Sequence, residues 1–283
     1  MSTTESQAAG SAGALFRAGD LGAAVAAANA AVRKAPADLA ARILLAEMLL
    51  FSGNLERADV ILDAASSIDP GAAIVVAEFR QLLRAETARC QLRRDGRLPE
   101  FLGEPTPASR EALIAMVALR AGETGAAAAA ASAVETLRPR VSGNHLAGDA
   151  TQPFDDFRDA DDLCAGFFEV LTTTGKYFWI PTERVQSVTF HAPKRARDLF
   201  WRRASMTVSS GPDGDVYIPA LYAHDSPELA DTLRLGRETD WRESGGNDGV
   251  AVVRGVGQRL FLMGEDAVSI MDLDELQFDE TAA

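Results

Sequence analysis

The chain has 283 residues, of which 47% are hydrophobic and 24% are charged, as is usual for a globular protein of about two domains. Its net charge is −13, and this excess of negative charge argues against binding to nucleic acid or to an anionic membrane surface. The sequence shows no apolar run long enough for a membrane span and no secretory signal, so we expect a cytoplasmic protein.

The two halves of the sequence differ in composition and charge. Residues 1–140 carry 15 Lys and Arg against 16 Asp and Glu, whereas residues 141–283 carry 13 against 25. The first half is rich in Ala, Leu and Arg, which favour helices, and the second in β-branched and aromatic residues, which favour strands. We therefore predict an α+β protein in three parts. These are a disordered segment at 1–10, an all-α helical domain at 11–140 and a small, acidic, mostly antiparallel α+β domain at 141–283.

A repeat with a period of 34 residues organises the helical half. The sequence AGDL at 18–21 recurs as SGNL at 52–55, and a partial third copy begins with AGET at 121–124. In all three copies a proline follows the glycine after 17 residues. Glycine permits a turn between two helices and proline ends the second one, so each copy is predicted to be a helical hairpin of the tetratricopeptide type. The predicted hairpins are residues 5–36, 39–70 and 108–139.

Small and polar residues refine this prediction. Asp20, Asn54 and Thr124 can each cap the second helix of a hairpin. Ala24 and Ala58 occupy equivalent positions, where a small side chain allows two helices to approach closely.

Residues 72–94, between the second and third copies, are predicted to form one long helix, followed by a loop at 95–107. Stacked hairpins form a concave groove that usually holds a peptide or a helix. In the second repeat, the residues that we expect to line this groove are Ile43, Glu47, Leu50 and Phe51. For Leu50 and Phe51 the alternative is burial in the core between helices.

The acidic half begins with five aspartates within 155–162. A calcium loop is excluded because the turn glycine and the terminal glutamate that it requires are not at the right spacing. Acidic side chains stabilise the first turn of a helix, so we expect a helix over the apolar run that follows, ended by Gly175.

Short apolar runs later in the acidic half predict strands. Alternation or β-branched and aromatic content marks each run, and the sequence GPDG at 211–214 is a strong turn signal between two of them. A mostly antiparallel sheet with one or two helices accommodates the runs. They are residues 177–181, 185–190, 206–209, 215–219, 250–253 and 257–263.

No pattern typical of a catalytic, metal or cofactor site is present. His145, His191 and His224 are not part of a nucleophile motif, and Cys90 and Cys164 are too few for a zinc site or a disulfide framework. The glycines form neither a dinucleotide loop nor a phosphate loop. We therefore expect no enzymatic activity, no cofactor and no bound metal.

Six sequence blocks in the second half, together with the preceding helical repeats, resemble the ImpE family, also called the TagJ or SciE type, of type VI secretion accessory proteins. The resemblance covers roughly residues 11–279. The blocks are GKYFWIP at 175–181, DLFWRRA at 198–204, VYIPALY at 216–222, LRLGRETDW at 233–241, GVGQRL at 255–260 and DLDEL at 272–276.

The resemblance implies a non-enzymatic cytoplasmic factor that is tied to the contractile sheath of the bacterial type VI machine. Some members of the family bind a helix of the small sheath subunit and are linked to the AAA+ ATPase that recycles contracted sheath. An adaptor that binds a helical segment of a sheath component is therefore the implied function.

Two alternatives remain open at this point. Six residues in the family-like blocks either form a second partner-binding patch, since Arg and Trp often anchor interfaces, or hold the sheet together as an internal cluster. These six residues are Arg234, Arg237, Asp240, Trp241, Gln258 and Arg259. The second alternative concerns the function: the acidic half would sense a small ligand or a modification, through an aromatic cluster around Trp179, Trp201 and Trp241.

Overall fold

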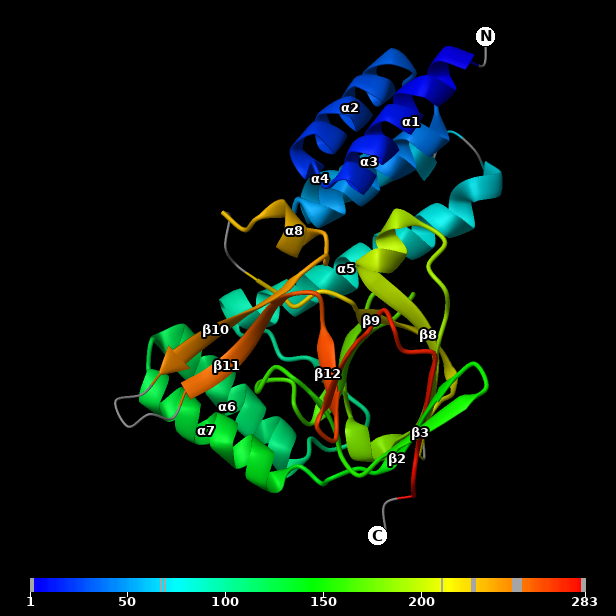
Figure 1. Cartoon of the computed structure of the whole chain (residues 1–283). Helices are drawn as coiled ribbons and strands as arrows, with labels where there is room; N and C mark the ends of the chain where they lie inside the picture. Colours follow the sequence, from blue (N-terminus) through cyan, green and yellow to red (C-terminus); the bar gives the residue numbers. More distant parts are fainter. Residues whose placement is uncertain are drawn as a thin grey trace.

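Paired helices form the first part of the computed structural model, which describes residues 3–66, 68, 70–209, 211–224, 228–245 and 251–280. Helix α1 (Thr3–Ala18) packs on α2 (Leu21–Lys34), and α3 (Leu39–Phe51) packs on α4 (Leu55–Ser66). After the short 3-10 helix η1 (Pro70–Ala72), the long helix α5 (Ala73–Asp95) lies between these four helices and the strands of the second half (Figure 1).

The repeat signals act as predicted in these first two hairpins. Gly19 and Gly53 have φ angles of +95° and +76° in the turns, a conformation that glycine adopts without strain. Asp20 accepts a hydrogen bond of 2.7 Å from the backbone N–H three residues further on, and Asn54 accepts an equivalent bond of 3.2 Å. Ala58 is fully buried, as a close crossing of helices requires.

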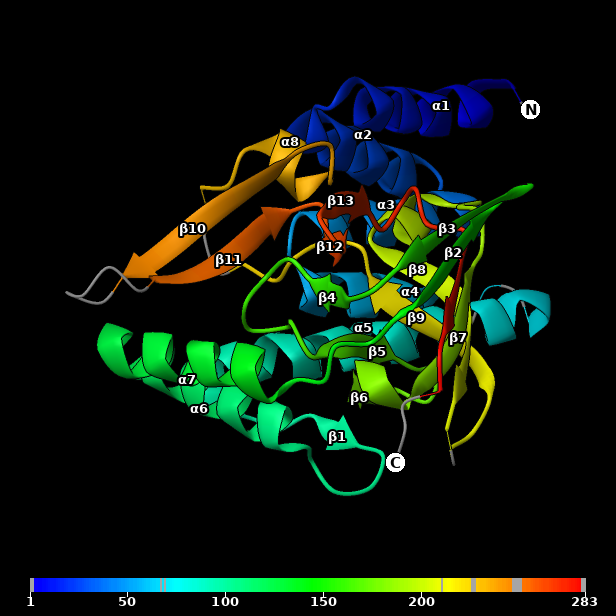
Figure 2. The ribbon, with the colours of Figure 1, turned by 60° about the horizontal axis from the view of Figure 1, so that its bottom comes forward.

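The third hairpin, α6 (Pro107–Ala121) and α7 (Thr124–Leu137), is also confirmed. It lies beyond the far end of α5, where α7 contacts the ribbon of β10 and β11 (Figure 2). The prediction that Thr124 caps α7 is wrong, because Glu123 is the N-cap residue and its side chain makes no capping hydrogen bond.

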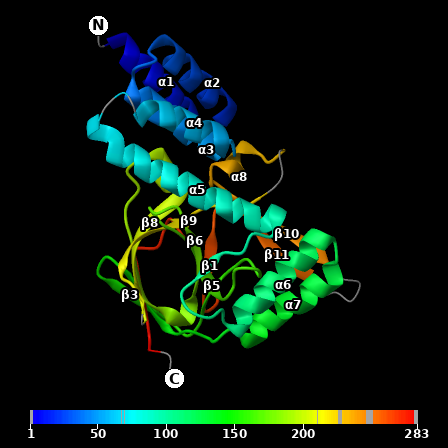
Figure 3. The same cartoon turned by 180° about the vertical axis from the view of Figure 1, so that it is seen from behind.

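A curved nine-stranded sheet forms the centre of the second half (Figures 1 and 3). Among the described pairings only that of β1 with β6 is parallel, so the predicted antiparallel character is confirmed. In spatial order the strands are β1 (Glu100–Phe101), β6 (Tyr177–Pro181), β5 (Phe167–Leu171), β9 (Gly214–Pro219), β8 (Trp201–Val208), β7 (Val185–Phe190), β14 (Glu275–Phe278), β2 (Gly143–Ala147) and β3 (Ala150–Phe154).

Two smaller sheets and some short helices complete the second half. One sheet is the ribbon of β10 (Thr239–Gly245) and β11 (Ala251–Gly257); the other joins β4 (Phe157–Asp159), β12 (Leu260–Met263) and β13 (Asp266–Ser269). Each predicted strand overlaps an observed one, although Val250 lies outside the described residues. The short helices are η2 (Thr182–Arg184), η3 (Ala196–Leu199) and α8 (Asp231–Arg234).

The helix predicted after the aspartates is wrong, since this segment forms β5, whose five residues are all buried. The carboxylates of Asp159 and Asp161 are buried as well, so they do not sit in an exposed first turn of a helix. Asp159 pairs with Arg259, and Asp161 accepts a backbone hydrogen bond from Leu163. Gly175, with φ +82°, lies in the turn from β5 to β6.

Two further observations concern the expected boundaries. Helix α1 begins at Thr3, within the first ten residues that we expected to be disordered. The expected loop at 95–107 contains β1, which pairs with β6, so the helical half contributes a strand to the sheet.

One hydrophobic core continues from the helices into the sheet. The ring of Phe51 in α3 lies 5.3 Å from that of Phe200, and the ring of Phe79 in α5 lies 6.0 Å from that of Trp201. The concave side of the helices is therefore already packed, in part, against the second half of the same chain.

Candidate interaction site

A cluster of buried charges joins α5 to the sheet. Arg89 of α5 donates to both carboxylate oxygens of Glu169 in β5, at 3.0 and 2.9 Å. Arg259, which precedes β12, also contacts Glu169 and pairs with Asp159 at 2.7 Å. Arg89 pairs in addition with Glu86, and each of these five side chains is at most 5% exposed.

Charge compensation within this cluster is strong at Glu169 and weaker at Asp159. Burial by itself would raise the pKa of Glu169, but the charges of Arg89 and Arg259 outweigh it and hold this pKa well below its usual range. Burial raises the pKa of Asp159 to about 6, against the opposing charge of Arg259. Burial likewise raises the pKa of Cys90 to about 12, so this thiol is not an activated nucleophile. The cluster serves to fix α5 on the sheet.

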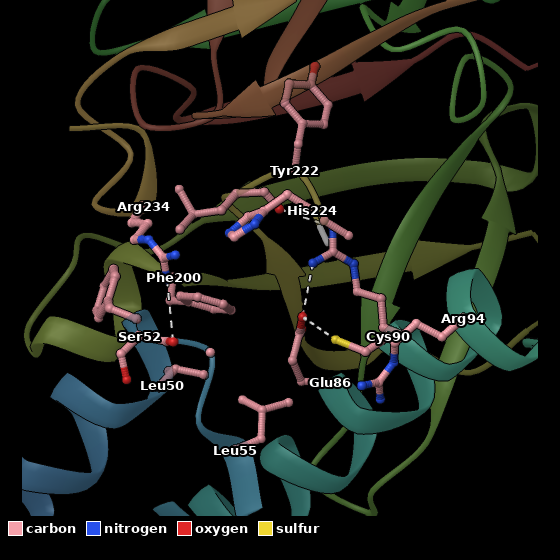
Figure 4. A pocket seen from close by; sticks show the side chains of 15 residues that line it. Leu50, Ser52, Leu55, Glu86, Cys90, Arg94, Phe200, Tyr222, His224 and Arg234 are labelled. Carbon is pink, nitrogen blue, oxygen red and sulfur yellow. Dashed lines mark hydrogen bonds and ion pairs between the residues drawn. The ribbon is translucent and has the colours of Figure 1, made fainter. Parts of the chain in front are cut away.

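A cavity of about 380 Å³ lies where the α3–α4 turn, α5 and the second half meet (Figure 4). Leu50 and Phe51, two of the residues predicted to line a groove, line this junction cavity, and both are almost fully buried. Arg234 crosses its rim and donates to the carbonyl oxygen of Ser52 at 3.4 Å. The alternative predicted for Leu50 and Phe51, burial in the core between helices, agrees with their exposed fractions of 0% and 2%.

The other two predicted groove residues line a second cavity, of about 430 Å³, which we call the open groove. Ile43 is half-buried there, and Glu47 is buried with its Oε1 lacking a hydrogen-bond partner. Burial raises the pKa of Glu47 to about 7, although the positive charge of Arg197 opposes this shift. The remaining lining residues are Ala40, Leu44, Ala72, Val75 and Arg195.

The segment around η3 separates the two cavities. Arg195, just before η3, lines the open groove, whereas Phe200, just after it, lines the junction cavity. The face predicted from the repeats is thus divided by the chain itself, and among the described residues the open groove lies beside the first part of α3.

Three of the six residues of the predicted patch hold parts of this chain together. Arg259 is fully buried in the charge cluster. Arg237 donates to the backbone carbonyls of Phe16 and Arg17 at the end of α1, at 2.8 and 2.7 Å. Arg234 bridges to the α3–α4 turn, as described above.

The other three residues lie on or beside the ribbon. Asp240 and Trp241 are exposed on β10, and Trp241 is 39% exposed. Gln258 is half-buried after β11, where its backbone N–H donates to Glu238 at 2.9 Å. The six residues therefore do not form one continuous patch.

The proposed aromatic cluster does not form either. Trp179 and Trp201 are fully buried, whereas Trp241 lies on the ribbon, with its ring 6.1 Å from that of Tyr222. Within the described ranges, no three His, Cys, Asp or Glu side chains are grouped so that they could hold a metal ion. None of the helices described is both long enough and apolar enough to cross a membrane.

Sequence reasoning missed the residues around η3. Lys194, Arg195, Arg197, Arg202 and Arg203 form a basic run in a half that is otherwise acidic. That contrast in charge was the available signal.

Comparison with known proteins gives consistent matches along the chain. The family model described as ImpE protein matches residues 151–277, and a tetratricopeptide repeat model matches residues 15–83. The type VI secretion system accessory component TagJ of Pseudomonas aeruginosa is 31% identical over 269 residues, covering 95% of this chain and 91% of the relative. The crystal structure of protein VPA1032 from Vibrio parahaemolyticus matches with a TM-score of 0.85 and 26% identity, covering 95% of this chain and 98% of that one.

Proposed function

The chain belongs to the ImpE family, and we propose that it is a non-enzymatic adaptor that binds a helical segment of the small sheath subunit of a type VI secretion system. Its curated relative is a type VI secretion accessory component, which supports an accessory role. Through this contact the protein would modulate sheath assembly or its recycling by the AAA+ ATPase.

The open groove is the observation that carries this proposal. Apolar side chains from two helices, among them Ile43, Leu44 and Val75, face a cavity that no segment of the described chain fills. Two helices with an apolar furrow between them suit the apolar stripe of a third, whose side chains recur at intervals of three and four residues.

Binding of the purified small sheath subunit to the whole chain tests the proposal. We expect a dissociation constant in the micromolar range, which corresponds to about −8 kcal/mol. Ile43→Asp should weaken binding at least tenfold, because it places a charge in the apolar furrow. Val60→Asp is the matched control, since Val60 is 62% exposed on α4 and does not line the groove. Absence of binding by the unmodified protein at tens of micromolar would refute the proposal.

Sensing of a small ligand is the second candidate, and the junction cavity favours it. Its volume of about 380 Å³ and its position between two parts of the fold are typical of small-molecule sites. A thermal-shift screen with metals and nucleotides tests this function, because a ligand that binds only the folded protein raises its melting temperature. A rise of several degrees would support sensing, and no rise with any compound would count against it.

A further inference from the structure

A third cavity, of about 320 Å³, adjoins the open groove, and Val75 and Arg195 line both. Four cationic side chains line this third cavity against two carboxylates, in a chain whose net charge is −13. One of the four, Arg203, pairs with Asp215 at 2.6 Å, which still leaves an excess of positive charge. The cations are Lys194, Arg195, Arg197 and Arg203, and the carboxylates are Glu78 and Asp198.

Arg197 lies in the wall of this cavity with an incomplete set of partners. Its side chain is 6% exposed, and its guanidinium lies 4.7 Å from the centre of the Phe79 ring. Nη2 is 3.6 Å from a carboxylate oxygen of Glu78, but Nε and Nη1 are buried without a hydrogen-bond partner. Arg89 and Arg259 differ in that each pairs with two carboxylates, although Nε of Arg259 also lacks a hydrogen-bond partner.

The two carboxylates that line this cavity accept hydrogen bonds from other donors, whereas the carboxyl of Glu47, whose charge also acts on Arg197, lines the open groove. Glu78 accepts a hydrogen bond of 2.6 Å from the hydroxyl of Tyr217. Asp198 accepts from the backbone N–H groups of Lys194 and Arg195, at 2.8 and 3.0 Å. Burial and the positive charge of Arg195 lower the pKa of Arg197 and outweigh the opposing charges of Glu47, Glu78 and Asp198, so these carboxylates compensate its charge only in part.

We infer that this third cavity is a carboxylate-binding pocket, which receives an aspartate or glutamate side chain of the segment docked in the open groove. A guanidinium with free N–H groups pairs in a planar, two-bond geometry with a carboxylate, and the pairing is strongest where water is excluded. The inference rests on the proposed function and specifies its partner: an amphipathic helix with an acidic residue beside its apolar stripe.

Titration of the small sheath subunit into variants of the whole chain tests the inference. Arg195→Ser, at an exposed position, and Arg197→Lys, which keeps the charge but loses the planar fork, should each weaken binding about tenfold. Arg110→Ser on α6, an exposed arginine that lines none of these three cavities, should leave binding unchanged. One Asp→Asn or Glu→Gln change in the partner helix should cause the same loss, and it should add nothing to the loss from Arg195→Ser.

The outcomes separate this inference from the proposed function. If the unmodified protein does not bind, both are wrong. If Ile43→Asp abolishes binding while Arg195→Ser and Arg197→Lys bind like the unmodified protein, the groove stands and the carboxylate pocket alone is refuted. Loss of binding in the arginine variants without coupling to any acidic residue of the partner would also refute it.

Discussion

Removal of the charge of Glu169 should destabilise the protein far more than removal of the charge of an exposed carboxylate. Glu169 is 2% exposed and lies between two guanidinium groups, those of Arg89 and Arg259. Glu169→Gln leaves both arginines with too little negative charge around them. Loss of one partner of a buried pair costs about 3–5 kcal/mol, since the remaining charge stays buried without compensation.

Thermal unfolding measures this cost. In a chain of this length each kcal/mol changes the melting temperature by about 2 °C, so Glu169→Gln should lower it by about 6–10 °C. Asp215→Asn is the matched control: Asp215 pairs with Arg203 at 2.6 Å, but both side chains are nearly half exposed. An exposed pair contributes about 0–1 kcal/mol, so the control should shift the melting temperature by 2 °C or less.

The pH dependence of the free energy of unfolding tests independently whether the charged form of Glu169 stabilises the protein. Because the pKa of Glu169 is lowered in the folded protein, its contribution is complete above the ordinary carboxyl pKa and is lost as the pH falls below it. The difference in the free energy of unfolding between the unmodified protein and Glu169→Gln should therefore become smaller as the pH falls. Equal losses of stability in Glu169→Gln and Asp215→Asn would refute the argument that burial makes the charge of Glu169 important for stability. A stability difference between Glu169→Gln and the unmodified protein that does not change with pH down to 3 would refute it as well.

Three further predictions follow from single positions. Ala58→Asp buries an unpaired charge and should cost about 3–5 kcal/mol in urea unfolding, whereas Ala129→Asp at an exposed position of α7 should cost little. Glu47→Gln should stabilise the protein increasingly between pH 5 and pH 8, by up to roughly 3 kcal/mol, because the raised pKa of about 7 makes the ionisation of Glu47 destabilising. A stability difference between this variant and the unmodified protein that does not change with pH would contradict this. Gly255→Ala should cost about 1–3 kcal/mol in the same assay, since its Cβ would lie 2.1 Å from an aromatic ring, whereas Gly245→Ala meets nothing within 4 Å and should be neutral.

The features that the sequence predicted correctly are those that depend on neighbouring residues. Gly19, Asp20 and Ala58 each act within one hairpin, so a repeated spacing was enough to place the turn, the cap and the close crossing. The strand β5 was missed because its five residues are buried on both faces, which leaves a continuous apolar run that periodicity cannot distinguish from a buried helix. The aspartates before it were misinterpreted because Arg259, the partner of Asp159, is 100 residues away.

The candidate site shows the same limit. The positions of Ile43 and Glu47 follow from the helical repeat alone, and both line the open groove. Phe51 follows the same pattern, but Phe200 covers it, and nothing in the repeat predicts that a segment near residue 200 returns to α3. The arginines around η3 were missed for the same reason, since only the fold brings Arg197 close to α5.

The residues that anchor α5 and η3 determine whether the open groove keeps its shape without a partner. Glu86 on α5 accepts a hydrogen bond of 2.9 Å from the indole N–H of Trp201, which lies two residues after η3 and begins β8. Arg89, one turn further along α5, is fixed to Glu169 in β5. The α5 wall of the groove and the segment around η3 are thus tied to the same sheet, and the contact between the rings of Phe51 and Phe200, 5.3 Å apart, holds α3 against that segment. In the proposed function, a partner helix would bind a site that is already formed. Binding to such a site costs little free energy for the ordering of its side chains. In the proposed function the buried charge cluster would therefore contribute to binding through rigidity, without contact with the partner.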